Sequence, residues 1–434
     1  MSNHLRCHNN GDKSYPDFIK IKNLCRLMVL FTMLAVFSKV SALSLSEAES
    51  LALANDPLME SHKAVARAWN NDAVADNQLP DPKLLMGLSN VPLDSLSLSQ
   101  EPMTQFVFGV QQSFPKGDSL ALKQIQSEWH AKAELARAND RRGKLKRTIR
   151  EDFFNLYYQV EAVRIIHRTR KLFAQLVDIT EAHYASGRVN QQDVLRADLE
   201  LSRLDDRAIK IQTDENVLRS KLSQWLGDAA WLPIDTDFPK LQEFSGNEDL
   251  NKLITEHPSI VIETAKLEVS KQGVAIVQQQ YKPAWGLGLE YRKRFGENPD
   301  SSERTDMMAA MVTLDIPLFT ENRQDKRVAA KEEKMMAVKL ARDDKLRQLK
   351  QVYDSNLVKL KGLDERQRKY KDNLIKSAEG NSKAAMKAYQ SGVTEFTNLM
   401  RAHITELDIR LSDLRVRVDR ALALAQLLYV TGEE

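Results

Sequence analysis

The residues best suited to chemistry do not form a recognisable catalytic or metal-binding motif. None of the six histidines after residue 42 has the His-x-x-x-His or Glu-x-x-His spacing that binds a metal ion (His62, His130, His167, His183, His257 and His403). The sequence has no Gly-x-x-x-x-Gly-Lys phosphate loop, no Gly-x-Ser-x-Gly elbow and no His-Glu-x-x-His motif. We therefore expect neither an enzyme nor a protein that holds a cofactor or a metal ion.

Two further groups of side chains invite a functional interpretation. Thioethers are soft ligands for copper, and five methionines lie in or beside segments with strand-like alternation (Met86, Met103, Met307, Met308 and Met311). Because of that alternation, we interpret them as strand side chains that face lipid or a core. The basic residues between Arg141 and Arg147 have acidic and Gln neighbours, which favours a solvated helix face.

Residues 1–42 are predicted to be a cleaved signal peptide. Lys20, Lys22 and Arg26 precede an apolar run from residue 27 to residue 37, and Val40-Ser41-Ala42 supplies the small residues that a signal peptidase recognises. A membrane anchor is the alternative, but this run is shorter than the roughly 20 residues that a spanning helix needs. Both cysteines, at positions 7 and 25, lie in this segment, so the mature chain would have no disulfide or thiolate metal site.

Composition and charge favour a helical protein that does not bind nucleic acid. Only 16 Gly and 13 Pro in 434 residues leave few turns, and helix-forming residues are abundant. The net charge is +3 for the whole chain. The predicted signal peptide contains six basic and two acidic residues, so its removal takes away +4 and leaves about −1. This balance lacks the basic excess typical of nucleic-acid binding.

The chain is predicted to contain two tandem copies of one unit, over residues 43–226 and 248–434, joined by a connector over 227–247. Tyr184-Ala-Ser186-Gly187 in the first copy recurs as Tyr389-Gln-Ser391-Gly392 in the second, 205 residues later. Asn55-Asp56-Pro57 and Ser113-Phe114-Pro115 have counterparts at nearly the same offset, which indicates an internal repeat.

Each copy is predicted to form a helix, a pair of strands, a long helix, a turn and a return helix. In the first copy Ser46 and Glu49 have the spacing of a capping box at the start of the first helix. The long helices are expected over 116–182 and 320–387, each about 100 Å long if unbroken. The return helices are expected over 190–226 and 395–430, after glycines that can adopt a positive φ (Gly187 and Gly392).

Alternation of apolar and polar residues predicts four strands, over about 82–94, 103–115, 283–293 and 305–317. Leu84, Met86 and Leu88 alternate with small or polar neighbours, as do Trp285, Leu287 and Leu289 in the second copy. Four strands cannot close into a cylinder, and unpaired strand edges are not tolerated in a hydrocarbon layer. Three chains would supply twelve strands, enough for a membrane-spanning cylinder with an aqueous lumen. The fold class is thus mainly α with a small β part.

From about Leu43 to the C-terminus, the chain resembles the TolC family of outer-membrane channel proteins. The resemblance rests on the segment Leu45-Ser-Glu47-Ala-Glu-Ser-Leu51-Ala-Leu-Ala54-Asn55-Asp-Pro57, on Phe114-Pro115-Lys116-Gly117 and on the two Tyr-x-Ser-Gly turns, in that order. The stretch from Leu79-Pro80-Asp81-Pro82 to Gln100-Glu101-Pro102-Met103-Thr104 is similar to members that serve cobalt-zinc-cadmium and copper-silver exporting pumps.

This resemblance implies a homotrimer in contact with outer-membrane lipid. Its strands would form a 12-stranded β-barrel, continued by a long α-helical barrel in the periplasm. It would dock through its helical turns, which contain Ser186, Gly187, Ser391 and Gly392. The partners would be a periplasmic adaptor, which is a membrane fusion protein, and an inner-membrane pump of the resistance-nodulation-division type. The channel would be the passive exit duct of this tripartite efflux system for heavy-metal cations, with the energy supplied by the pump.

The resemblance also implies a periplasmic gate just after the turns. Asp193 and Tyr389 match positions that narrow the mouth in the family. Where the best-known members have acidic residues after the second turn, this chain has Asn398 and Arg401, and a lumen-facing Arg401 would repel cations. The alternative is that Asp193 and Asn398 only support the turns and the helix starts.

Two other functions are compatible with the sequence. One is a channel for drugs or secreted proteins instead of metal ions. The other is a periplasmic coiled-coil scaffold or adaptor, which would need the same helices but would not need four segments with an apolar alternate face.

Overall fold

The computed structural model describes residues 42–244 and 249–432. The predicted signal peptide lies outside these residues except for Ala42, as do both cysteines and the last part of the predicted connector. Among the described residues, no helix is both long enough and apolar enough to cross a membrane.

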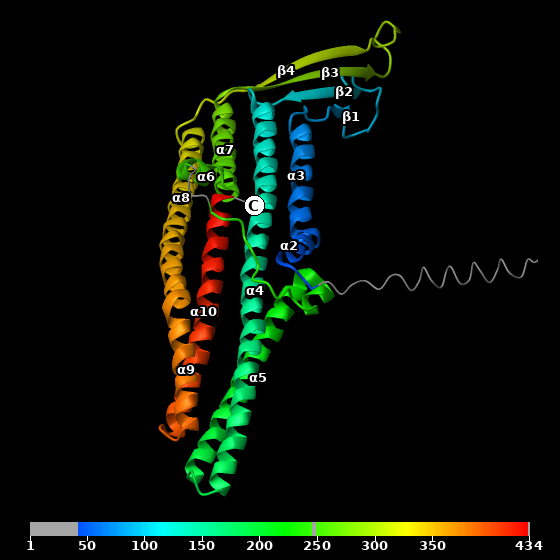
Figure 1. Cartoon of the computed structure of the whole chain (residues 1–434). Coiled ribbons are helices and arrows are strands. Elements are labelled where there is room, and N and C mark those ends of the chain that lie inside the picture. The colour runs from blue at the N-terminus through cyan, green and yellow to red at the C-terminus, as the bar shows by residue number, and fades with distance from the viewer. Residues whose placement is uncertain (1–41, 245–248, 433–434) are drawn as a thin grey trace, which may run out of the picture.

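The described part of the chain is mainly helical with one small sheet, as the sequence predicts (Figure 1). The first half contains α2 (Leu45–Ala54), α3 (Pro57–Asp76), β1 (Lys83–Ser89), β2 (Gln105–Phe114), α4 (Ser119–Ala185) and α5 (Gln191–Leu226). The second half contains α6 (Leu250–Glu256), α7 (Pro258–Gln278), β3 (Ala284–Arg294), β4 (Met307–Asp315), α8 (Gln324–Lys369), α9 (Ile375–Gln390) and α10 (Phe396–Thr431).

Equivalent caps start the helices that precede each strand pair. The Asp56 carboxylate accepts a hydrogen bond from the Leu58 N–H, and Pro57 occupies the first turn of α3. His257 and Pro258 play the same two parts at α7, where the imidazole accepts from the Ser259 N–H. At α2 the capping box is Ser44 with Glu47, so the predicted pair Ser46 and Glu49 is two residues too late.

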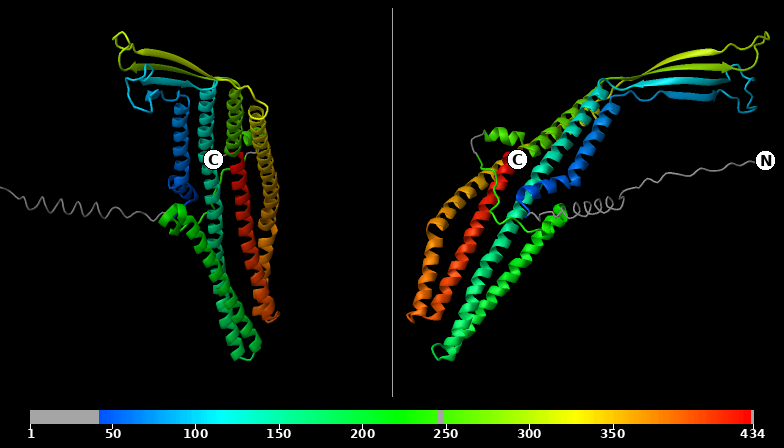
Figure 2. Two further views of the ribbon diagram at one scale, coloured as in Figure 1. Left: turned by 180° about the vertical axis from the view of Figure 1, so that it is seen from behind. Right: turned by 45° about the vertical axis from the view of Figure 1, so that its right-hand side comes forward.

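The helices form a long layer, and the sheet projects from one end of it (Figures 1 and 2). Helix α4 runs almost the whole length of the layer. Helices α3 and α5 lie beside it, nearly end to end, and α7 and α10 do the same on its other flank. Helices α8 and α9 form the outer side next to α7 and α10. The two hairpins α4–α5 and α9–α10 therefore end together, far from the sheet.

The predicted helix over 320–387 is wrong in two respects. A turn closed by the Arg323 N–H and the Thr320 carbonyl (3.1 Å) delays the helix start to Gln324. A π-helical turn at Tyr370–Leu374 then separates α8 from α9. Such a turn inserts one extra residue without Pro or Gly, so no punctuation in the sequence reveals it. Strands β1, β2 and β4 are also shorter than predicted, most of all β1, which ends at Ser89 and not at residue 94. Strand β3 has the predicted length but is shifted by one residue.

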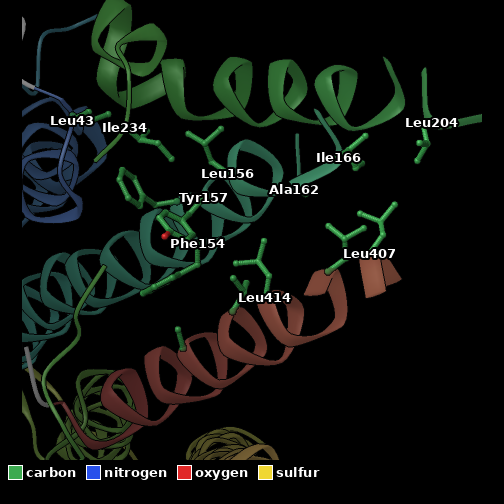
Figure 3. Packing of buried hydrophobic residues seen from close by; sticks show 14 of the residues in the cluster. Leu43, Phe154, Leu156, Tyr157, Ala162, Ile166, Leu204, Ile234, Leu407 and Leu414 are labelled. Atoms are coloured by element: carbon green, nitrogen blue, oxygen red, sulfur yellow. The ribbon is translucent and has the colours of Figure 1, made fainter. Parts of the chain in front are cut away.

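The main core lies around the middle of α4, where the two halves of the chain meet (Figure 3). Phe154 and Leu156 of α4 are fully buried, and Leu407 and Leu414 of α10 face them. The connector closes the other side, because Ile234 pairs with Leu43 in a short parallel bridge. This core fixes the α4–α5 hairpin against α10.

Candidate functional site

The four strands form one antiparallel sheet in the order β1-β2-β3-β4. Its register aligns the apolar side chains of all four strands on one face. Two rows cross the whole sheet: Leu84, Val110, Leu289 and Ala310, and next to it Met86, Phe108, Tyr291 and Met308. We call this surface the apolar sheet face. Its members are exposed although they are large, for example Leu289 at 53% and Met86 at 65%. Monomeric soluble proteins rarely expose so continuous an apolar surface.

The opposite face of the sheet has mostly small or polar side chains. One of its rows contains Leu85, Gly109, Glu290 and Ala309, and the next contains Lys83, Gln111, Gly288 and Met311. Glu290 forms an ion pair with Arg292 on this face at 2.8 Å. Met307 and Met311 belong to this polar sheet face and are exposed, so they are not part of a core. Met86 and Met308 do lie on the apolar sheet face.

Both edges of the sheet are open. Among the described residues, β1 pairs only with β2 and β4 pairs only with β3. Each edge therefore presents a row of unpaired backbone N–H and C=O groups. Because the sheet has an even number of antiparallel strands, β4 and β1 run in opposite directions. A second copy can therefore continue the antiparallel pattern by placing its β1 beside β4.

At the other end of the molecule, two turns of identical geometry join the hairpin helices. Gly187 and Gly392 have φ values of +72° and +74°. The Gly187 N–H donates to the Tyr184 carbonyl (2.9 Å) and the Arg188 N–H to the His183 carbonyl (2.9 Å). The equivalent bonds in the second turn measure 3.0 and 2.9 Å. Both are Schellman motifs, and the Ser186 and Ser391 hydroxyls each donate to a carbonyl three residues earlier.

Replacing a turn glycine should strain the backbone without a steric clash. An added Cβ at Gly392 meets nothing within 4 Å, so Gly392→Ala should destabilise only through its positive φ, by about 1–2 kcal/mol. Hydrogen exchange of the amides around residue 392 should accelerate accordingly. Gly362→Ala is the matched control, because Gly362 lies inside α8 with equally open surroundings, and there Ala should stabilise the helix by up to about 1 kcal/mol. Equal protection of the turn amides in wild type and Gly392→Ala would contradict this account of the turn.

Tyr389, one of the predicted gate residues, is buried just before the second turn. Only 9% of it is exposed, and its ring lies 5.6 Å from the Phe396 ring and 6.1 Å from the His183 ring, between centroids. Burial raises the pKa of its phenol, and the negative charge of Asp193 adds to this effect. Tyr389 thus packs the α9–α10 hairpin against α4, within the electrostatic reach of Asp193.

The other predicted gate residues lie closer to solvent. Asp193 is half-buried in the first turn of α5, where its N–H donates to the Asn190 carbonyl (3.0 Å). Asn398 occupies the matching position of α10, and its amide nitrogen donates to the Thr394 hydroxyl (3.2 Å). Arg401 is exposed and lines a groove of about 360 Å³ between α5 and α10. The structure does not bring these three side chains into contact within one chain.

Two side-chain contacts join α5 to α10, and the sequence does not predict either of them. Arg196 of α5 donates to the Thr397 hydroxyl of α10 (2.7 Å), and Arg207 of α5 pairs with Asp408 of α10 (2.8 Å). We call them the hairpin links. Each joins residues 201 positions apart, and an exposed Arg on a helix carries no signal of so distant a partner. Exposed pairs of this kind are worth at most about 1 kcal/mol each, so they add little to the contact that the buried core makes between the hairpins.

Among the described residues, no group of three or more His, Asp or Glu side chains is arranged to bind a metal ion. Several histidines instead contact other side chains or cap a helix. His62 contacts Glu134 at 2.8 Å, His130 stacks on Trp69 at 4.3 Å between centroids, and His257 caps α7. His403 is buried between α4 and the α9–α10 hairpin.

Comparisons with known proteins agree with this architecture. Residues 250–433 match the family described as outer membrane efflux protein. Among solved structures, the chain is similar to the outer membrane protein VceC of Vibrio cholerae (17% identity, TM-score 0.76, 89% of this chain and 96% of that chain). It is also similar to CusC (15%, 0.72, 89% and 92%) and to the outer-membrane channel OprN (14%, 0.77, 90% and 90%). No curated protein sequence matches the chain.

Proposed function

We propose that this chain, whose residues 250–433 match the outer membrane efflux protein family and which shares the fold of TolC-like channels, forms the exit duct of an efflux system as a ring of three copies. In this proposal the strands lie in the outer membrane and the helices in the periplasm, and the protein acts as a passive channel.

The observation that carries the proposal is the combination of an exposed apolar sheet face with two open edges. In hydrocarbon, every unpaired backbone group costs several kcal/mol, so an isolated four-stranded sheet would be unstable there. Pairing β4 of one copy with β1 of the next satisfies both edges at once. The apolar sheet face then contacts lipid, and the polar sheet face lines the lumen. Three copies give twelve strands, a cylinder wide enough for an aqueous passage.

The turns at the ends of the hairpins are the proposed docking site for the adaptor and the pump. The turns at Ser186-Gly187 and Ser391-Gly392 are exposed at the end opposite the sheet, where a periplasmic adaptor and, through it, an inner-membrane pump of the resistance-nodulation-division type would dock. Asp193, Tyr389, Asn398 and Arg401 lie within the first turns behind this tip, and we propose that they line the periplasmic mouth. The weak hairpin links would let that mouth widen when the adaptor binds.

For the cargo we propose heavy-metal cations, on the basis of the resemblance of residues 79–104 to members that serve such pumps. Deleting the gene should lower tolerance to cobalt, zinc, cadmium, copper or silver several-fold, and a plasmid copy should restore it. Antibiotic tolerance measured in the same strains separates the two kinds of duct. Unchanged metal tolerance with lost antibiotic tolerance would support a channel for drugs instead. Only an Arg401 that faces the lumen would repel cations.

A further inference from the structure

A buried histidine lies where the two hairpins meet. His403 of α10 is 8% exposed, and its ring meets the Phe173 ring of α4 edge to face, 6.5 Å between centroids. The buried Nε2 atom has no hydrogen-bond partner among the described residues. Its other ring nitrogen, Nδ1, lies 3.9 Å from the nearer Glu406 oxygen, which is beyond hydrogen-bond distance. A neutral imidazole tolerates this position better than an imidazolium, which needs an acceptor for both N–H groups.

His403 lines a cavity of about 560 Å³ between α4, α9 and α10. Charged groups face the cavity from each of these helices: Glu161 and Arg168 from α4, Lys383 from α9, and Glu406, Arg410, Asp413 and Arg417 from α10. The nearest carboxylate is already satisfied, because Glu406 accepts hydrogen bonds from Ser382 (2.5 Å) and Arg410 (3.0 Å). Arg410 also bonds to Glu379 of α9 (2.6 Å).

The same cavity lies next to a place where the helix can bend. Ile375, the first residue of α9, lines it and directly follows the π-helical turn at Tyr370–Leu374. Such turns interrupt the regular hydrogen-bond ladder of a helix and are common sites of kinks. A movement of α9 and α10 about this turn would expose the His403 ring to water without unfolding either helix.

We propose that His403 is a pH-sensitive latch that holds the α9–α10 hairpin against α4 while the imidazole is neutral and releases it when the imidazole is protonated. Its role as a gate rests on the proposed channel function. Protonation places a charge on a buried ring, and exposure of that ring to water is the way to solvate the charge.

The pKa of His403 in the closed state determines the direction of the pH effect. Burial lowers the pKa of His403 below its ordinary value of about 6.5, and the opposing attraction of Glu406 is smaller. The closed state therefore binds the proton less well than the open state. Its stability is fully present above about pH 6.5 and declines as the pH falls below that value. Each unit of difference in pKa changes the ratio of closed to open protomers tenfold at low pH.

The test measures the conductance of the purified protein in planar lipid bilayers at pH 7.5 and 5.5. We expect several-fold higher conductance at pH 5.5 for the wild type and for His167→Gln, an exposed histidine of α4. His403→Gln and His403→Leu, which stay neutral, should show the same conductance at both values. If the protein conducts, the latch is ruled out when these two variants keep the wild-type ratio, or when the conductance of the wild type does not respond to pH.

A second measurement separates the latch from the proposed channel. Hydrogen exchange of the α10 amides around residue 403, corrected for the intrinsic effect of pH, does not depend on conductance. Faster exchange at pH 5.5 in the wild type but not in His403→Gln supports the latch even if no current flows, in which case only the channel function fails. Equal protection at both pH values in the wild type would overturn the latch whether or not the protein conducts.

Discussion

Replacing Leu289 with Arg should remove the protein from the outer membrane. Leu289 lies in the middle of β3 on the apolar sheet face, in one row with Leu84, Val110 and Ala310. An Arg near the bilayer midplane of such a sheet costs about 2–4 kcal/mol, and a ring of three copies bears this cost three times, about 6–12 kcal/mol in total. We expect at least a tenfold lower level in the outer-membrane fraction, measured by quantitative immunoblotting after carbonate extraction.

The matched control is Gln111→Arg, which introduces the same charge on the polar sheet face. Gln111 pairs with Gly288, the neighbour of Leu289 in β3, so both substitutions lie at nearly the same depth. Water in the lumen would solvate this Arg, and the protein should remain in the membrane at the wild-type level. If both variants insert equally well, the apolar sheet face does not contact lipid. If carbonate releases the wild-type protein as well, a periplasmic scaffold becomes the better interpretation.

The sheet faces could be predicted from the sequence because alternation has a period of two. Once Leu84, Leu287 and Leu289 are assigned to strands, the pleat alone determines which side chains share a face. Alternation along β4 likewise places Met307 and Met311 on the face opposite Met308. Their positions belong to the polar set, and treating all methionines as apolar fillers concealed this.

The interruption at Tyr370–Leu374 and the hairpin links could not be predicted for a different reason. A π-helical turn shifts the helix by one residue without a breaker, so the apolar spacing on both sides still appears continuous. The links Arg196–Thr397 and Arg207–Asp408 join residues that are adjacent only after both hairpins have packed on the central core. A single sequence contains no record of such distant pairs.

The gate remains a prediction that rests on the family resemblance. Tyr389 is buried against His183 and Phe396, which makes it part of the contact between hairpins. Asp193 lies on α5, and Asn398 and Arg401 lie on α10. A ring of these side chains would have to be built by neighbouring copies.

Strand pairing between copies should be detectable with pairs of cysteines on β1 and β4. In a Cys7→Ser, Cys25→Ser background the chain has no other cysteine, so an introduced pair reports only on itself. Leu88 lies on the apolar sheet face of β1, and Ala310, Val312 and Leu314 lie on the same face of β4. Directly opposed residues of an antiparallel pair bring their Cβ atoms to about 4.5–5.5 Å, within reach of a short bifunctional maleimide.

The most direct test of the ring of copies is therefore cross-linking in intact membranes of Leu88→Cys combined in turn with Ala310→Cys, Val312→Cys or Leu314→Cys. We predict that one of these three combinations yields a covalent trimer as the largest product in denaturing gels. Leu88→Cys with Met311→Cys, whose side chains lie on opposite faces, should yield little or none. The account is contradicted if all three combinations remain monomeric, or if the opposite-face pair is linked as efficiently as the best of them.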